Sequence, residues 1–162
     1  MEKGEAAEYY DTISPSYDEL YGAEQLSKYE MVKDLIPKKG LILDAGCGTG
    51  LITRLLGDVV GVDLSYNLLK VHAYNLRIVN ADVQNLPFKD EVFDVIVSFT
   101  VLQDIIDAPK SIYELKRVLK KGGKIVLSVL NKDKANDIRV CLNNNFKNLK
   151  EKELEKDVVF YN

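Results

Sequence analysis

The sequence has 162 residues, enough for one domain with a substantial core, and its 46% apolar and 29% charged residues are ordinary for a globular protein. It holds no run of ~18 apolar residues, and its acidic N-terminus lacks the basic and apolar regions of a secretory signal, so we expect a cytoplasmic protein that does not enter a membrane. Two cysteines and one histidine are too few for the usual zinc or iron–sulfur sites, and we expect no metal. We interpret that histidine, His72, as an ordinary helix residue.

Charge is distributed unevenly along the chain. Residues 1–108 carry 9 Lys+Arg against 18 Asp+Glu, a balance of −9, whereas residues 109–162 carry 13 against 7, a balance of +6. The basic C-terminal third is interpreted either as solvated helix faces or as a surface that meets an acidic partner or an RNA backbone. The sequence leaves both interpretations open.

An arm of 38 residues precedes the first apolar run. Five of the nine tyrosines fall within residues 9–29, and residues 23–36 are predicted to form a helix. The arm either packs on the core or lies as a lid over a site. We treat residues 1–38 and the core, residues 39–162, as parts of a single domain.

From residue 40 onward, short apolar runs alternate with amphipathic stretches. The runs are rich in Val and Ile and end at turn signals, which is typical of parallel strands covered on both faces. They span residues 41–45, 58–63, 76–81, 93–99 and 124–130. The alternation predicts an α/β fold with a Rossmann-like, doubly wound sheet and helices on both faces.

The clearest helix is predicted over residues 107–122. Asp107 can cap it, Ser111 and Glu114 have the spacing of a capping box, and Gly122 is predicted to end it. Its apolar face comprises Ile112, Leu115, Val118 and Leu119.

A carboxylate stands at the end of each of the first three apolar runs. Asp63 follows Asp44 by 19 residues, and Asp82 follows Asp63 by 19. Each interval is predicted to hold one loop, one helix and one strand, so the three carboxylates share the sheet edge where open α/β sheets bind ligands. A single Asp there is commonly a helix cap, but three in register favour a binding site. Asp63 suits the two hydroxyls of a ribose, and Asp82 suits the exocyclic amine of adenine.

The first carboxylate lies beside a glycine-rich loop, "LILDAGCGTG", residues 41–50. Gly46 and Gly48 match the start of the dinucleotide fingerprint, but Leu51 replaces its third glycine, and the lysine of a P-loop is absent. At ~4 Å, Asp44 would repel a phosphate by roughly 1–4 kcal/mol. The loop therefore favours a ligand with an adenosine end and a cationic, phosphate-free middle, such as S-adenosylmethionine, whose carboxylate can meet backbone N–H groups at a helix N-terminus.

These motifs resemble those of the class I S-adenosylmethionine-dependent methyltransferases, in particular the group that includes the ubiquinone/menaquinone-type C-methyltransferases and many small-molecule and tRNA methyltransferases. The likeness covers nearly the whole chain, in five ordered stretches: residues 9–21, 41–50, 59–65, 80–105 and 115–131. It implies a seven-strand, mostly parallel sheet whose last strand is antiparallel. It also implies that residues 148–154 and 157–161 form the last two strands, although the Lys, Glu and Leu of this tail favour a helix by local propensity.

The resemblance also implies roles for single residues. Asp44 would lie at the methionine part of the cofactor, Asp63 at the ribose and Asp82 at the adenine edge. Tyr17 would close over the cofactor from the arm, and Ser98 would lie under the sulfonium. The implied cofactor-binding set is Tyr17, Asp44, Ala45, Gly46, Gly48, Asp63, Leu64, Asp82, Val83 and Ser98. Cys47, within the loop, is interpreted as a small filler and not as a nucleophile.

The acceptor side departs from the family pattern. Many relatives carry a histidine after the fourth strand, where this chain has Gln103 and Asp104, and no cap is inserted after the fifth strand. We place both residues near the acceptor and assign no general base. The prediction is a methyltransferase that uses S-adenosyl-L-methionine, releases S-adenosyl-L-homocysteine and acts on a small molecule, a tRNA or a protein. The alternative is a cofactor-binding subunit or sensor module, and a homodimer or a small partner subunit stays open.

Overall fold

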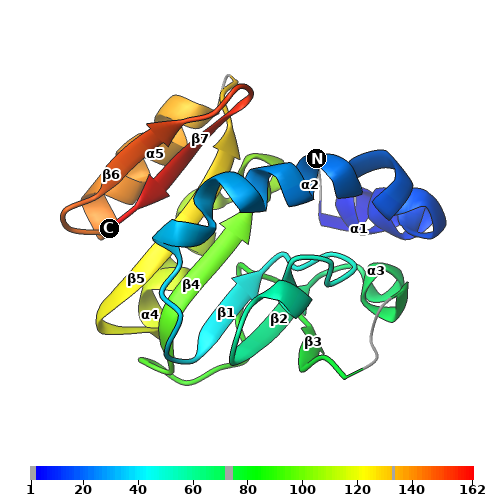
Figure 1. Ribbon diagram of the computed structural model, residues 1–162, viewed down its shortest axis with the longest axis horizontal. Helices are drawn as coiled ribbons and strands as arrows, with labels where there is room; N and C mark the ends of the chain where they lie inside the picture. The colour runs from blue at the N-terminus through cyan, green and yellow to red at the C-terminus, as the bar shows by residue number, and fades with distance from the viewer. Residues whose placement is uncertain (1–2, 72–74, 133) are drawn as a thin grey trace.

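The computed structural model describes residues 3–71, 75–132 and 134–162. A seven-stranded sheet in the order β3-β2-β1-β4-β5-β7-β6 runs through the molecule (Figure 1). Its strands are β1 (Ile42–Ala45), β2 (Val59–Asp63), β3 (Ile78–Asn80), β4 (Phe93–Phe99), β5 (Leu119–Leu130), β6 (Lys150–Glu153) and β7 (Asp157–Tyr161). The first five strands pair in parallel, and β7 is antiparallel to both β5 and β6. The predicted fold class and the antiparallel last strand are confirmed.

The described residues also form five α-helices and four short 3-10 helices, of which α1, α2 and two 3-10 helices precede the first strand. The α-helices are α1 (Lys3–Ile13), α2 (Tyr17–Val32), α3 (Tyr66–Val71), α4 (Ala108–Val118) and α5 (Ala135–Asn145). The 3-10 helices are η1 (Ser14–Ser16), η2 (Lys33–Leu35), η3 (Thr53–Leu55) and η4 (Leu102–Asp104). His72 lies outside the described residues, so its predicted place in a helix stays a prediction.

The sheet has a hydrophobic core on each face because alternate residues of a strand point to opposite sides. Val95 and Val97 of β4 join Ile42 in one core, whereas Ile96 joins Leu43 in the other. Helices α4 and α5 supply the second core with Ile112, Leu115, Ile138 and Leu142. The other core, which contains Val95 and Val97, is covered by the end of α2, by η2 and by the segment around η3. It includes Val32 and Ile52. Burial on both faces explains why these strands read as continuous apolar runs.

Three helix predictions are wrong in detail. The helix predicted at residues 23–36 begins at Tyr17, six residues earlier, and its last turn, Lys33–Leu35, is a 3-10 helix. The interval between the first two carboxylates holds the 3-10 helix Thr53–Leu55 instead of a full helix, since only six residues separate Gly50 from Gly57.

The helix predicted over residues 107–122 ends at Val118, because Leu119 pairs with Phe93 and begins β5. Strand β5 is therefore five residues longer than predicted. The capping box is also wrong. Asp107 alone caps the helix, accepting a 2.9 Å bond from the Lys110 N–H, while the Glu114 carboxylate binds the Leu86 N–H.

The order of the strands places a topological switch between β1 and β4, the two strands at the centre of the parallel region. Ligands of open α/β sheets bind at such a switch, beyond the carboxyl ends of the strands. Figure 1 shows α1 and α2 at that arrowhead end of the sheet. No helix among the described residues is long and apolar enough to cross a membrane.

Candidate cofactor site

An open cavity of about 800 Å³ lies at the carboxyl ends of β1, β2 and β4. Its lining includes the predicted site residues Tyr17, Gly46, Gly48, Asp63, Leu64, Asp82, Val83 and Asp104. A narrower cavity of about 370 Å³ shares Tyr17, Gly46, Gly48 and Phe99 with it and is also lined by Asp44. The two cavities therefore meet at the glycine loop, and together they form one site that extends to both sides of it.

The glycine loop after β1 depends on conformations that other residues rarely adopt. Gly46 and Gly48 have φ angles of +82° and +55°. A Cβ on Gly46 would lie 2.3 Å from the Val101 side chain, so no larger residue fits there. The Gly46 N–H donates to the Val62 carbonyl at 2.7 Å, which fixes the loop against β2. The backbone can thus approach a ligand closely, as the glycine pattern predicts.

Asp63 ends β2 and is held rigidly at the wall of the wider cavity. One carboxylate oxygen accepts a 2.8 Å bond from the Gly48 N–H, and the other accepts a 2.9 Å bond from the Ser65 N–H. Burial raises the pKa of this carboxyl, and the backbone bonds from residues 65 and 48 oppose the rise. Each oxygen keeps further acceptor capacity, so the carboxylate is oriented and still able to accept hydroxyl groups.

Asp82 follows β3 and lies across the same cavity. Its carboxylate accepts a 2.9 Å bond from the Gln84 N–H and a 3.3 Å bond from the Gln84 side-chain amide. Val83 and Leu64 line the same cavity, so its wall combines apolar side chains with a carboxylate. Such a wall suits a flat heteroaromatic ring with an exocyclic donor group.

Asp44 lies apart from the other two carboxylates, in the narrower cavity. Its side chain is 2% exposed, and it accepts a 2.7 Å bond from the Thr53 hydroxyl. The pKa of this carboxyl is raised to about 7, mainly by burial. The bond from Thr53 opposes the rise, and the charge of Asp63 adds to it. The sheet brings Asp63 and Asp82 into one cavity and sets Asp44 at the other side of the glycine loop.

Two tyrosines of the arm, Tyr10 and Tyr17, line the wider cavity. The ring centroids of Tyr10 and Tyr17 are 6.2 Å apart, and Tyr21 continues the cluster, 5.2 Å from Tyr17. The Tyr10 hydroxyl donates to the Asp104 carboxylate at 3.1 Å. Burial raises the pKa of both cavity-lining tyrosines, so each phenol remains a neutral donor.

Three predicted residues contribute indirectly. Ser98 and Ala45 do not line either cavity; the Ser98 hydroxyl donates a 2.6 Å bond to the Ala45 carbonyl and so joins β4 to β1. Gln103 also lines neither cavity. Its side-chain amide donates to the Thr100 carbonyl at 2.6 Å and to the Asp104 carboxylate at 3.1 Å. Cys47 is buried, and burial raises the pKa of its thiol well above the usual value, which suits a filler.

Several residues that line the wider cavity are absent from the sequence prediction. They are Tyr10, Ser65, Leu68, Gln84, Phe99, Thr100, Val101, Ile105 and Ile106. Most follow directly on the ends of β2, β3 and β4, so the signal that identified Asp63 and Asp82 also applies to them. Tyr10 has no such signal, because a helix position in the arm carries no information about the strand ends.

Comparisons with known proteins show the family and the fold of the chain. The model of a family described as "Methyltransferase domain" matches residues 43–127, more than half of the chain. An uncharacterized protein of Methanocaldococcus jannaschii is 34% identical over 154 residues, covering 92% of this chain and 61% of that protein. A demethylmenaquinone methyltransferase of Staphylococcus saprophyticus is 33% identical over 143 residues, covering 76% of this chain and 61% of the enzyme. The chain thus spans about three fifths of the length of these relatives.

Solved structures share the fold. The crystal structure from Thermotoga maritima named "SAM-dependent methyltransferase, possible histamine N-methyltransferase" superposes with a TM-score of 0.80 at 20% identity, covering 96% of this chain and 97% of that one. One chain of a complex between the Trm112 methyltransferase activator and a methyltransferase from Haloferax volcanii gives a TM-score of 0.71 at 18% identity, covering 89% and 77%. The chain belongs to the methyltransferase-domain family, with the class I fold of S-adenosylmethionine-dependent enzymes.

Proposed function

We propose that this chain is a methyltransferase with S-adenosylmethionine as the methyl donor. The arrangement of carboxylates about the glycine loop carries the proposal. Asp63 and Asp82 border the wider cavity, to which we assign the adenosine, and Asp44 borders the narrower one, to which we assign the cationic amino-acid end. The loop between them brings bare backbone to both cavities, and Asp44 disfavours a pyrophosphate in that place.

The residues of the wider cavity would position the nucleoside. Asp63, oriented by two backbone N–H groups, would accept the ribose hydroxyls, and Asp82 would accept from the adenine amine. Leu64 and Val83 supply apolar contact for the base. When bound, S-adenosylmethionine supplies a methyl group that its sulfonium already activates for displacement.

The chain's own contribution to methyl transfer is alignment and the exclusion of water. Holding an acceptor in line with the methyl group can lower a barrier by ~7–11 kcal/mol. Tyr10 and Tyr17 line the cavity, and so does Asp104, bonded to Tyr10, beside which we place the acceptor. An acceptor that must lose a proton would need a base, and we assign none.

The charge of the wider cavity bears on the acceptor. The described residues that line it include no Lys, Arg or His, and with Asp63 and Asp82 assigned to the nucleoside, Asp104 is the lining carboxylate left to meet an acceptor. Such a lining favours a neutral or cationic small molecule over a phosphate-rich one. An RNA acceptor would have to be held by basic residues outside this lining. Incubation with methyl-labelled cofactor and extract separated into small molecules, RNA and protein tests the preference, and label in the RNA fraction alone would contradict it.

A second candidate is a cofactor-binding subunit that needs a partner for activity. The structural likeness to one chain of the Trm112 complex favours it, since an activator is part of that assembly. The two candidates differ in one measurable respect. If the isolated chain methylates an acceptor unaided, the subunit hypothesis is wrong.

Cofactor binding tests the proposal directly. Calorimetry of the folded wild-type chain should show binding of S-adenosylmethionine and S-adenosylhomocysteine in the micromolar range. Asp63→Ala removes two hydrogen bonds to a charged acceptor, each worth about 1.5–3 kcal/mol, and should weaken both ligands by at least about 100-fold. The matched control is Asp34→Ala, an exposed residue of η2, which should leave binding unchanged. A folded wild-type chain that binds neither ligand would exclude the function.

A further inference from the structure

Thr100, the first residue after β4, is held in an unfavourable backbone conformation at the wall of the wider cavity. Its φ angle is +59°, in the left-handed region. A β-branched residue in that region is an outlier, and such conformations persist only where the surroundings enforce them. A glycine would adopt it without cost. The structure must therefore contain the groups that hold Thr100 in place.

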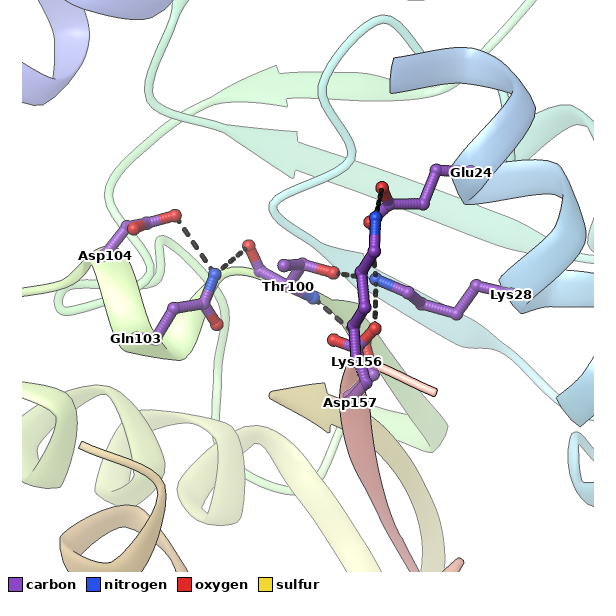
Figure 2. Close-up of polar contacts among 8 residues, drawn as sticks. Glu24, Lys28, Thr100, Gln103, Asp104, Lys156 and Asp157 are labelled. Carbon is purple, nitrogen blue, oxygen red and sulfur yellow. Dashed lines mark hydrogen bonds and ion pairs between the residues drawn. The ribbon is translucent and has the colours of Figure 1, made fainter. Parts of the chain in front are cut away.

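Thr100 forms hydrogen bonds with three side chains, those of Ser128, Gln103 and Lys28, and with the backbone carbonyl of Ser128. Its N–H donates to the Ser128 carbonyl and to the Ser128 hydroxyl, both at 3.0 Å. Its carbonyl accepts a 2.6 Å bond from the Gln103 amide, and its hydroxyl accepts from the Lys28 ammonium. Figure 2 shows Lys28 reaching from α2 to Thr100, with Gln103 on the opposite side.

Lys28 is itself buried, with only 3% of its side chain exposed. Its ammonium lies 2.9 Å from the carboxylate of Asp157, the first residue of β7, which is equally buried. The second Asp157 oxygen has no hydrogen-bond partner among the described residues. The Glu24 carboxylate lies 3.9 Å from the same Lys28 ammonium and also forms an exposed ion pair with Lys156 at 3.3 Å (Figure 2).

The energetics of this pair argue for a role other than holding the fold together. Removing two charges from water costs several kcal/mol for each ion, and well-packed apolar residues often stabilise a fold as well or better. The pair here also leaves one carboxylate oxygen unsatisfied. What it does provide is an ammonium fixed in direction toward the Thr100 hydroxyl, which an apolar residue cannot supply.

We propose that Lys28, anchored by Asp157, is a positioning residue that holds Thr100 in its left-handed conformation and so shapes the cofactor-facing wall after β4. The inference rests on the proposed function, because the wall matters through cofactor binding. The same wall includes Val101, which packs against Gly46, and Asp104, which the Gln103 amide links to the Thr100 carbonyl. Lys28 also belongs to α2, whose first residue, Tyr17, covers the cavity.

Measurements in the wild-type chain and in a Thr100→Gly variant separate the positioning of Thr100 by Lys28 from simple structural support. The double variant Lys28→Met/Asp157→Asn removes both charges and leaves no buried ion unpaired. In the wild-type background it should weaken S-adenosylhomocysteine binding about tenfold in calorimetry. In a Thr100→Gly background the same two substitutions should weaken binding less than twofold, because glycine keeps the left-handed conformation without help.

Two further variants complete the test. Ser128→Ala removes one acceptor of the Thr100 N–H without changing charge, and it should weaken binding severalfold only in the wild-type background. Lys156→Met breaks the exposed ion pair beside the site and should leave binding within twofold. Circular dichroism and thermal melts check that each variant is folded.

The outcomes distinguish this inference from the proposed function. Equal losses in both backgrounds, or no loss in either, would overturn the role of Lys28 while wild-type binding still supports the cofactor site. A folded wild-type chain without affinity for the ligand would overturn the proposed function and this inference with it.

Discussion

At the scale of single residues, Asp44 couples protonation to the proposed cation site. Its pKa of about 7, raised mainly by burial from an ordinary 3.8, means that the folded chain holds a proton there that the unfolded chain releases. Between about pH 4 and 7 this carboxyl therefore holds more protons in the folded than in the unfolded state, and its contribution to the free energy of unfolding of the cofactor-free protein falls as pH rises through this range. The carboxylate is kept at a cost in stability, which a cationic ligand would offset.

This coupling predicts that S-adenosylmethionine binds more tightly as pH rises from about 6 to 8. The ionised Asp44 attracts the cation and the protonated form does not, so binding below pH 7 should release a proton. Calorimetry in two buffers with different ionisation heats measures that release directly. Asp44→Asn should abolish the pH dependence and weaken binding at pH 8 about tenfold, whereas Asp34→Asn should change neither. An unchanged pH dependence in Asp44→Asn would show that another group is responsible.

At the scale of elements, the sequence predicts where strands and helices exist better than where they end. The Val- and Ile-rich runs identify β1, β2 and β4 because both faces of the sheet are buried there, and they also identify β3, an edge strand that is only partly buried. The end of α4 depends instead on Leu119 pairing with Phe93, a contact between residues far apart in sequence. The start of α2 is missed because Ser-Pro-Ser suggests a turn, although Pro15 lies in the 3-10 helix that leads into α2.

Helix α4 also fixes the loop that follows the third carboxylate. The Arg117 guanidinium donates to the Leu86 carbonyl at 3.0 Å and the Phe88 carbonyl at 2.8 Å, and it pairs with Glu114 on its own helix. A lysine cannot make this set of planar, divergent bonds. Arg117→Lys should therefore lower the free energy of unfolding by about 1–3 kcal/mol in urea titrations. The reverse exchange at its exposed neighbour, Lys116→Arg, should change it by less than about 0.5 kcal/mol.

At the scale of the whole molecule, the tail shows how packing overrides local propensity. Strand β6, Lys150–Glu153, is fully exposed and consists of residues that favour helices. It is a strand because β7, whose Val158, Val159 and Phe160 are completely buried, offers hydrogen-bonding groups on the side away from β5. Its alternating charges also protect the sheet edge from pairing with another chain. The resemblance to a family predicted this hairpin, and the residues alone did not.

The site was predictable to the extent that it lies at strand ends. The regular spacing of Asp44, Asp63 and Asp82 identified one sheet edge, and the glycine loop identified its centre. The covering residues come from the arm and from the loop after β4, where position depends on tertiary contacts such as the bond between Tyr10 and Asp104. Strain at Thr100 is likewise invisible in sequence, because it arises from groups on three separate elements.

The arm should close over the cofactor as part of binding. Among the residues of α1 whose side chains are described, none is buried, and α1 is held through Tyr10 on Asp104 and through Asp11 on Ser65. An element with so few buried contacts opens at low free energy. A ligand under Tyr10 and Tyr17 would add contacts available only in the closed arrangement.

Hydrogen exchange should therefore slow about tenfold across α1 when S-adenosylhomocysteine is added at saturating concentration. Strand β4, buried in the centre of the sheet, should keep its slow exchange, and the exposed edge strand β6 should stay fast in both states. The matched variant is Tyr10→Phe, which loses the bond to Asp104 but keeps the ring. It should exchange faster in α1 without ligand and regain most of its protection with ligand, because the ring still covers the cavity. Unchanged exchange in α1 beside a clear rise in melting temperature would mean that the ligand binds to the core alone and that the arm is packing, not a lid.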